Sequence, residues 1–410
     1  MSQAAYAAPP VVDSIQQRAL LIGVFSLLLC VLGAFFSPEQ FFRSYLMGYL
    51  FFIGVALGSL AIVMLQHLSG GAWGIVIRRL LESATRTLPL LALLFVPLIL
   101  GMRHLYLWTD SEVVRQSEVL QHKQPYLNVP FFLARAVLYF AVWLVLAYFL
   151  NKWSLEQDRK ANPVIARRLQ VISGPGLVLY GLTVTFASID WVMSIEPQWF
   201  STIYGLLFIG GQGLSAMSFI IAMAILLAKR EPMSSIFVPS HFQDLGKLLL
   251  MFTMLWAYFS FSQLLIIWAG NLPQEIPWYL RRWQGGWQWV GILLIVFHFA
   301  LPFVLLLSRD LKRNTNALAV VAALLILMRF IDLFWLTVPE FYAGRFHIHW
   351  MDFAAPAGVG GVWLAFFAWQ LKTRPLLPLN DPELEDALAS HHGVGSSEFR
   401  TKNSRPDRGR

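Results

Sequence analysis

The sequence predicts an all-α polytopic membrane protein, and three observations lead to this fold class. Of the 410 residues, 57% are hydrophobic and only 13% are charged, whereas about a quarter of the residues in a soluble domain are charged. Apolar runs long enough to span a bilayer recur about ten times. The cations gather in alternate connecting segments, as expected of loops on one side of a membrane. This composition excludes a disordered protein, a nucleic-acid-binding arm and an ordinary cytosolic enzyme.

The predicted spans each contain about 20 mostly apolar residues, the length that crosses a bilayer as a helix. Residues 1–17 lack the basic start of a cleaved signal peptide and are predicted to be a cytoplasmic N-terminus. Residues 374–410 are rich in Pro, Ser, Asp and Arg and are predicted to form a disordered cytoplasmic tail. The ten spans are 18–36, 44–67, 87–107, 129–150, 169–190, 203–228, 247–269, 286–308, 316–337 and 354–372.

The distribution of Lys and Arg predicts the orientation of the chain. With the N-terminus inside, 22 of the 31 Lys and Arg residues fall on cytoplasmic segments and 7 on outer loops. Short cytoplasmic loops carry the excess of Lys and Arg in membrane proteins, so both termini are predicted to be cytoplasmic. Arg135 and Arg329 remain, and both fall within spans. Seven tryptophans near the outer span ends, Trp335 among them, are expected to form an interfacial belt.

A weak internal repeat divides the chain into two four-helix units. Asp190 ends span five and Asp332 ends span nine, and each is followed seven residues later by a Pro with a neighbouring Glu. Phe-Ile-Gly, with a Ser five residues after the Gly, occurs at 52–54 and again at 208–210. Equal spacing in units four helices apart predicts repeats related by an axis along the membrane normal. The predicted parts are a peripheral first span (18–43), a first four-helix bundle (44–190), an outer loop (191–202), a second four-helix bundle (203–337), and an outer loop with the last span (338–373).

Four ionisable side chains at membrane depth form two predicted pairs. Ionisable groups inside a membrane are costly and mark functional sites by default. Arg329 and Asp332 are three residues apart and share one helix face. Arg135 lies in span four, and Asp190 ends span five, its expected antiparallel neighbour. Two interpretations remain open: the pairs are structural clasps that fix helix register, or the outer carboxylates exchange protons or hold a polar head group.

His298 is the only histidine in the middle of a span, so the chain cannot supply the four axial ligands of a di-haem cytochrome. The single cysteine, Cys30, excludes disulfides and any iron–sulfur cluster held by this chain alone. A His-x-His at 347–349 near Asp352 is weak evidence for a metal, and no metal site is predicted. The candidates for a proton pathway or a quinone site are Asp190, Arg135, Arg329, Asp332, His298 and Lys247.

A basic segment follows span two on the predicted inner side. It contains Arg78, Arg79 and Arg86 together with Glu82, and its pattern is amphipathic. Basic amphipathic segments bind anionic lipid head groups at the membrane surface. We therefore expect this segment to face lipid head groups.

Several motifs resemble those of the NrfD-like membrane subunits of bacterial alternative complex III, a quinol:electron-acceptor oxidoreductase. The longest is TVTFASIDWVMSIEP at 183–197, and further motifs lie at 201–205, 256–259 and 267–273. The likeness covers nearly the whole chain. Of the two ten-helix subunits in that complex, the shorter, ActF-type one is most similar.

The resemblance implies two four-helix bundles with the first and last helices outside them, in the bacterial inner (cytoplasmic) membrane. It implies a sister NrfD-like membrane subunit, an iron–sulfur subunit and cytochrome c subunits as partners, and these partners hold the iron–sulfur clusters and haem c. The family's quinol site lies chiefly in the sister subunit, which leaves open whether this chain binds quinone. The implied role is to support quinol oxidation and to conduct protons, through Asp190, Arg329, Asp332, His298 and Lys247, without a redox centre of its own.

Two other functions remain as alternatives. The parallel repeat and the buried Arg/Asp pairs also suit a proton-coupled secondary transporter. Such transporters break helices at the midplane with Gly or Pro, and span six contains Gly-Gly-Gln-Gly at 210–213, although span two has no matching run. The third interpretation is a purely structural membrane anchor, in which every buried charge is a clasp.

Overall fold

The computed structural model describes residues 6–159, 162–342, 345–381 and 384. Within these residues the chain forms helices and turns without a strand, and ten helical segments are long and apolar enough to cross a membrane. The predicted all-α polytopic fold is confirmed. The segments are α1 (Val11–Ala34), α2 (Pro38–Ser69), the run from α4 to α6 (Arg78–Leu100), α10 (Val129–Arg159), α11 (Pro163–Trp191), α12 (Tyr204–Ala228), α13 (Pro239–Gly270), the run from α15 to α16 (Trp287–Leu307), α18 (Thr315–Thr337) and α19 (Met351–Lys372).

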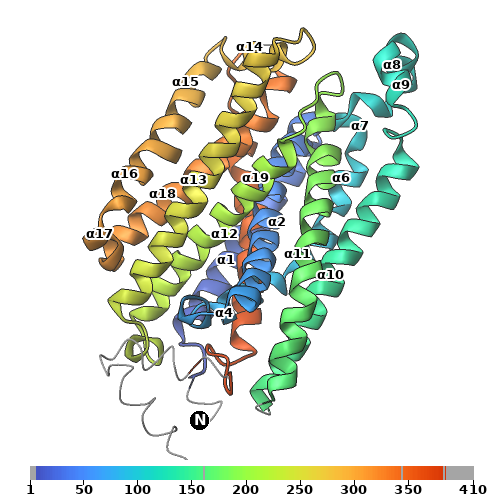
Figure 1. The fold of residues 1–410 in the computed structure, drawn as a ribbon. Coiled ribbons are helices and arrows are strands. Elements are labelled where there is room, and N and C mark those ends of the chain that lie inside the picture. Colours follow the sequence, from blue (N-terminus) through green and yellow to red (C-terminus); the bar gives the residue numbers. More distant parts are fainter. Residues whose placement is uncertain (1–5, 160–161, 343–344, 382–383, 385–410) are drawn as a thin grey trace, which may run out of the picture.

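Short helices connect the spans, and they distinguish the two ends of the molecule. We call the end with α8, α9 and α14 the α14 end, and the opposite end the termini end (Figure 1). The backbone N–H of Leu376 donates to the carbonyl of Tyr6 at 2.8 Å, so the N- and C-terminal segments meet there. The short helices are α3 (Ala72–Ile75), α7 (Met102–Leu105), η2 (Leu107–Thr109), α8 (Ser111–Gln116), α9 (Glu118–Lys123), η3 (Met193–Ile195), η4 (Met233–Ser235), α14 (Ile276–Arg282), α17 (Arg309–Arg313) and η6 (Pro339–Phe341).

The spans of each predicted four-helix unit pack against one another. In the first, α2 packs against α4, α5 and α11, and α10 packs against α11. In the second, α12 packs against α13 and α18, and the π-helical turn η5 (Leu294–Ala300) packs against both α13 and α18. Contacts between α2 and α12 join the two groups at the centre of the molecule (Figure 1).

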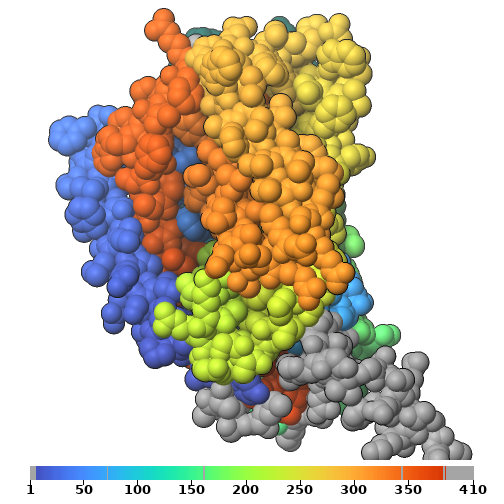
Figure 2. Space-filling model, turned by 90° about the vertical axis from the view of Figure 1, so that its left-hand side faces the viewer, coloured from blue at the N-terminus to red at the C-terminus, as the bar shows by residue number. Residues whose placement is uncertain are grey.

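The first and last spans lie outside these groups. α1 packs mainly on α19, and α19 in turn packs on α2. Gly23 of α1 faces Gly361 of α19 so closely that a Cβ on either glycine would meet backbone atoms of the other helix. Two small residues at a crossing let membrane helices approach. Figure 2 shows α1 in blue and α19 in red-orange, with a crevice between α19 and the orange run from α15 to α16.

Span three differs from the predicted single helix over 87–107. Helix α4 (Arg78–Thr85) begins earlier, and α5 (Leu88–Leu94), α6 (Val96–Leu100) and α7 follow with breaks between them. Pro89 and Pro97 lie near the starts of α5 and α6, and proline lacks the N–H that would continue the helix. The run of apolar residues predicts too late a start for span three, because the first turns of this span are polar and buried.

The basic segment after span two does not face lipid, contrary to expectation. Arg78 and Arg79 are only 4% and 2% exposed. Arg79 pairs with Glu82 at 2.5 Å and with both carboxylate oxygens of Asp158 on α10, and Arg78 pairs with Asp381. Two of the acidic partners, Asp158 and Asp381, come from distant parts of the sequence, so the local pattern indicates a basic face with an excess of cations.

The start of the predicted disordered tail is packed on this cluster. Leu376, Leu377 and Leu379 are buried, and Arg374 donates to the carbonyl of Asn151 at 3.1 Å. Burial lowers the pKa of Arg374, and the Glu82 carboxylate raises it. Burial has the larger effect, so the pKa lies below its usual value. The prediction of disorder rests on the mean composition of 374–410, which does not show this short apolar stretch. Residues 385–410 lie outside the described residues.

Candidate functional site

Arg329 and Asp332 form a buried pair on α18, as their spacing predicts. Arg329 donates from Nη1 to Oδ2 of Asp332, and each residue is 2% exposed. Trp256 on α13 donates its indole N–H to the same Oδ2 at 3.0 Å. In the described part of the chain, Oδ1 of Asp332 receives no hydrogen bond. This carboxylate is therefore only half satisfied.

The glycine run in α12 makes room for this pair. α12 continues unbroken from Tyr204 to Ala228. A Cβ on Gly211 would collide with the guanidinium of Arg329, so the arginine lies directly against the helix backbone. The glycine run thus serves close packing. It does not break α12, so it does not support the transporter alternative.

His298 lies beside the pair in the π-helical turn η5. Pro302 follows four residues later. In a regular α-helix its ring would clash with the carbonyl of residue 298, and proline has no N–H to donate to that carbonyl. Turns of π-helix often mark functional sites. The His298 side chain is fully buried, and its ring centroid lies 4.0 Å from that of Trp256. Neither ring nitrogen has a hydrogen-bond partner within the described residues.

Asp190 in the first bundle is fully satisfied. Arg135 of α10 donates to both carboxylate oxygens, from Nε and Nη2, at 2.8 Å each. The hydroxyl of Tyr139 adds a third bond at 2.7 Å. The Arg135 guanidinium also donates to the carbonyl of Tyr126 and lies 3.8 Å from the centroid of that ring. The predicted pairing between spans four and five is confirmed.

A cavity of about 620 Å³ opens beside Asp332, lined by α13, α14, α15, η5 and α18. We call it the α13–α18 cavity. Its lining is largely apolar and aromatic, and Asp332, Ser260, Gln263 and Arg282 contribute polar side chains. Ligand pockets of this size and character are typical of small-molecule sites. Asp190 does not line it.

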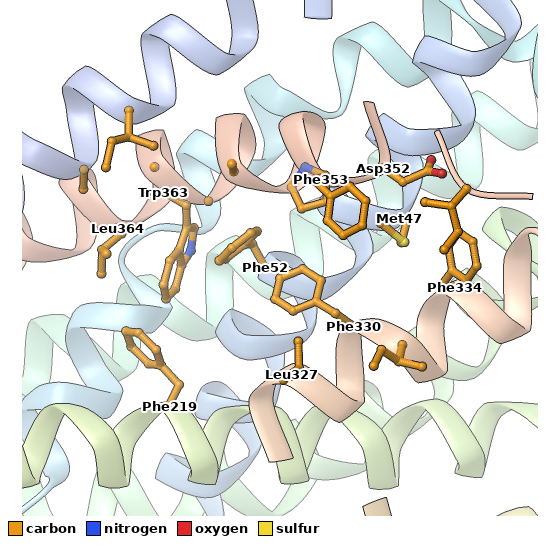
Figure 3. A pocket seen from close by; sticks show the side chains of 18 of the residues that line it. Met47, Phe52, Phe219, Leu327, Phe330, Phe334, Asp352, Phe353, Trp363 and Leu364 are labelled. Carbon is orange, nitrogen blue, oxygen red and sulfur yellow. The ribbon is translucent and has the colours of Figure 1, made fainter. Parts of the chain in front are cut away.

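A second cavity, of about 730 Å³, lies behind the crevice of Figure 2 and is lined by α15, α18 and α19 (Figure 3). The labelled rings of Phe52, Phe330 and Phe353 point into it. Among the described residues, Asp352 is the only charged one that lines it. Its Oδ1 receives bonds from Gln40 and Ser44 at 2.9 and 2.6 Å, and its Oδ2 receives one from the backbone N–H of His349. This cavity therefore offers an apolar wall and a carboxylate that is already satisfied.

The two repeat-related glutamates meet at one arginine at the α14 end. Arg281 pairs with Glu196 and with Glu340, the latter at 2.5 Å. The next residue, Arg282, is 2% exposed and donates to the carbonyls of Trp278, Trp335 and Leu336. Burial lowers the pKa of Arg282 to about 9. The loops after the two bundles are thus tied together by adjacent arginines.

Lys247 lies apart from the other candidate residues. It pairs with Asp244 at 2.8 Å, and its side chain is 56% exposed. It precedes Trp256 by nine residues on α13, about 14 Å along the helix axis. The His-x-His of 347–349 is likewise separate, and among the described residues no group of three His, Cys, Asp or Glu side chains could hold a metal.

Comparison with protein-family models and with curated proteins gave no match.

Three residues of the site were not singled out from the sequence: Tyr139, Arg282 and Trp335. Tyr139 is four residues after Arg135 and so shares its helix face, which is a usable signal. Arg282 had no such signal, because its partners are backbone carbonyls. Trp335 was assigned to the interfacial belt, yet it lines the α13–α18 cavity.

Proposed function

We propose that this chain is an integral membrane subunit of a respiratory quinol-oxidising complex of the alternative complex III type. In this proposal it supports quinol oxidation and conducts protons, while partner subunits transfer the electrons. One observation carries the proposal: Asp332 is buried at membrane depth beside a cavity, with one carboxylate oxygen unbonded among the described residues. The motif resemblance supports the same role.

Asp332 is suited to accept and release a proton. Arg329 and Trp256 both bind Oδ2, so a proton can bind Oδ1 without breaking either bond. Oxidation of a quinol releases protons that need an acceptor in a medium without bulk water. Arg329 compensates the charge when Asp332 is ionised, which a buried carboxylate requires.

His298 is the next acceptor in the proposed relay. An imidazole nitrogen can accept or donate a proton, and the two ring nitrogens of His298 bond no described residue. Its ring stacks near Trp256, which itself binds Asp332. A relay between the two residues therefore needs a bridging water or a side-chain rotation. Lys247 lies too far along α13 to join it.

The proposal assigns Arg135 and Asp190 to the clasp interpretation. Every oxygen of Asp190 is occupied by donors at 2.7–2.8 Å. Protonation would break at least one of these charge-assisted bonds, which are stronger than neutral ones. We therefore place the proton route in the second bundle.

The proposed setting is the bacterial inner membrane, with the termini end cytoplasmic. The 22 to 7 distribution of cations supports this orientation. The α14 end then faces outward, where α8 and α9 project beyond the bundles (Figure 1). We propose that iron–sulfur and cytochrome c subunits dock at this end and that a sister NrfD-like subunit lies beside the chain in the membrane.

The test is purification of the full chain from its own membranes in a mild detergent. We expect haem c and iron–sulfur proteins to co-purify with it, and the assembly to oxidise quinol. Recovery of the chain alone, under conditions that keep other respiratory complexes intact, would contradict the proposal.

A further inference from the structure

The rim of the α13–α18 cavity faces the membrane. Tyr258, Phe261 and Ile295 line the cavity and are 64%, 62% and 57% exposed. They lie on α13 and η5, within segments long and apolar enough to cross the bilayer. A ligand therefore enters from the lipid phase, and its apolar portion can remain among the acyl chains.

Two hydrogen-bonding groups of the lining are buried without partners. They are the indole N–H of Trp335 and the hydroxyl of Ser260, neither of which has a hydrogen-bond partner within the described residues. A buried polar group without a partner destabilises the fold, and a ligand that bonds it regains that loss. Together with Oδ1 of Asp332 they provide donors and an acceptor in one cavity, and a ligand would satisfy all three.

Gly291 leaves space directly beside one of these donors. A Cβ built on Gly291 would lie 3.7 Å from Nε1 of Trp335, and Gly291 itself lines the cavity. A larger side chain at this position would fill the space in front of the indole N–H. The unpaired donor thus lies beside Gly291 in the wall of the cavity.

The chemistry of the lining favours a planar, uncharged ring over an anionic lipid head group. Trp256, Trp335 and Tyr279 present aromatic faces or edges to the cavity, which pack well against a flat ring. The guanidinium of Arg282 is already committed to three carbonyls. An anion would therefore meet the Asp332 carboxylate without a free cation to bind it.

We propose that the α13–α18 cavity binds the head of a membrane-soluble quinone or quinol, an inference that rests on the function proposed above and assigns its ligand to the second bundle of this chain. Trp335 Nε1 and Ser260 Oγ, which are buried in the wall of the ligand-free cavity, turn toward the ligand and donate to the carbonyl oxygens of the quinone. Asp332 Oδ1 accepts from a hydroxyl of the quinol. The apolar tail leaves past Tyr258, Phe261 and Ile295.

The test is equilibrium binding of a tritiated decyl-benzoquinone, and of the matching naphthoquinone, to the full chain in phosphatidylcholine nanodiscs, with phosphatidylglycerol added as a competitor. Gly291→Leu should raise the Kd by at least tenfold because it fills the site. Gly174→Leu is the matched control, since a Cβ on this α11 glycine meets nothing within 4 Å, and its Kd should equal that of the wild type. Trp335→Phe keeps a ring, loses the donor, and should raise the Kd by about tenfold.

Folding is checked by size-exclusion chromatography and circular dichroism. If Gly291→Leu does not fold, Gly291→Ala replaces it, because its Cβ would make only ordinary contacts of 3.7–4.0 Å; a lower affinity is again expected. An unchanged Kd in both the folded Gly291 variant and Trp335→Phe would overturn the inference, as would complete competition by phosphatidylglycerol. Failure of quinone to bind, in a chain that still co-purifies with haem c proteins, overturns this inference alone. Quinone binding by a chain that always purifies alone supports the site and contradicts the proposed complex.

Discussion

Asp190 and Asp332 occupy equivalent positions in the two halves of the repeat, yet their surroundings differ. Asp190 accepts three bonds, two from an arginine on a neighbouring helix and one from Tyr139. Asp332 accepts two bonds on a single oxygen, and its arginine lies on the same helix. Only Asp332 lines a cavity of several hundred Å³.

The difference shows how one sequence pattern can serve two purposes. A carboxylate that accepts charge-assisted bonds from a second helix fixes the register between helices, and protonation would weaken those bonds. A carboxylate with an unbonded oxygen beside a cavity can accept a proton on that oxygen. Both interpretations are open from the sequence, and we propose the clasp for Arg135 and Asp190 and proton exchange for Arg329 and Asp332.

The largest expected effect on stability comes from breaking the Asp190 clasp. Arg135→Leu leaves the Asp190 carboxylate buried without its cation, and we expect a loss of about 3–5 kcal/mol. Unfolding of the purified chain in detergent, followed by circular dichroism, measures it. The double variant R135L/D190L should regain much of the loss, since it removes both charges. Equal stability of R135L and the wild type would contradict the clasp.

A matched pair of substitutions compares the neutral donors of the two carboxylates. Tyr139→Phe and Trp256→Phe each remove one hydrogen bond to an aspartate, with an expected loss of about 1–3 kcal/mol for a bond to a charged group. Only Trp256→Phe should also slow quinol oxidation by the assembled complex. The comparison fails if the two variants have the same activity.

Removal of the His298 side chain should affect stability and activity in opposite directions. His298 makes no hydrogen bond to a described residue, so His298→Leu should leave the free energy of unfolding unchanged or raise it by about 1 kcal/mol. The same variant should release protons more slowly during turnover. If His298→Leu instead lowers the free energy of unfolding as much as a substitution that opens a cavity in the core, the role of His298 is packing and not proton transfer.

The smallest effect is expected at the α14 end. Arg281 is 35% exposed, and its partners Glu196 and Glu340 are 8% and 18% exposed; solvent at the arginine screens these pairs, which should contribute about 1 kcal/mol. Arg281→Gln should therefore lower stability by about 1 kcal/mol or less, and high salt should reduce the difference further. A larger loss would mean that this contact is a main attachment between the bundles.

The sequence predicted the spans and both buried pairs because their signals are local or follow from antiparallel neighbours. Apolar length places a helix in a membrane, and the spacing of Arg329 and Asp332 places them on one face. It could not predict the Arg78–Asp381 pair, whose members are 303 residues apart. Nor could it show which aspartate keeps an unbonded oxygen, because that depends on Tyr139, Trp256 and the cavity beside α18.

The most direct test of the account compares Asp332→Asn with Asp190→Asn in the assembled complex, reconstituted in liposomes. Both changes remove one buried carboxylate beside one arginine, so each controls for the loss of charge pairing in the other. We predict that Asp332→Asn lowers the rate of quinol-driven proton release by about 100-fold or more, whereas Asp190→Asn lowers stability and leaves the rate of the intact complex within about twofold. Equal rates in the two variants, with both complexes intact, would contradict the account.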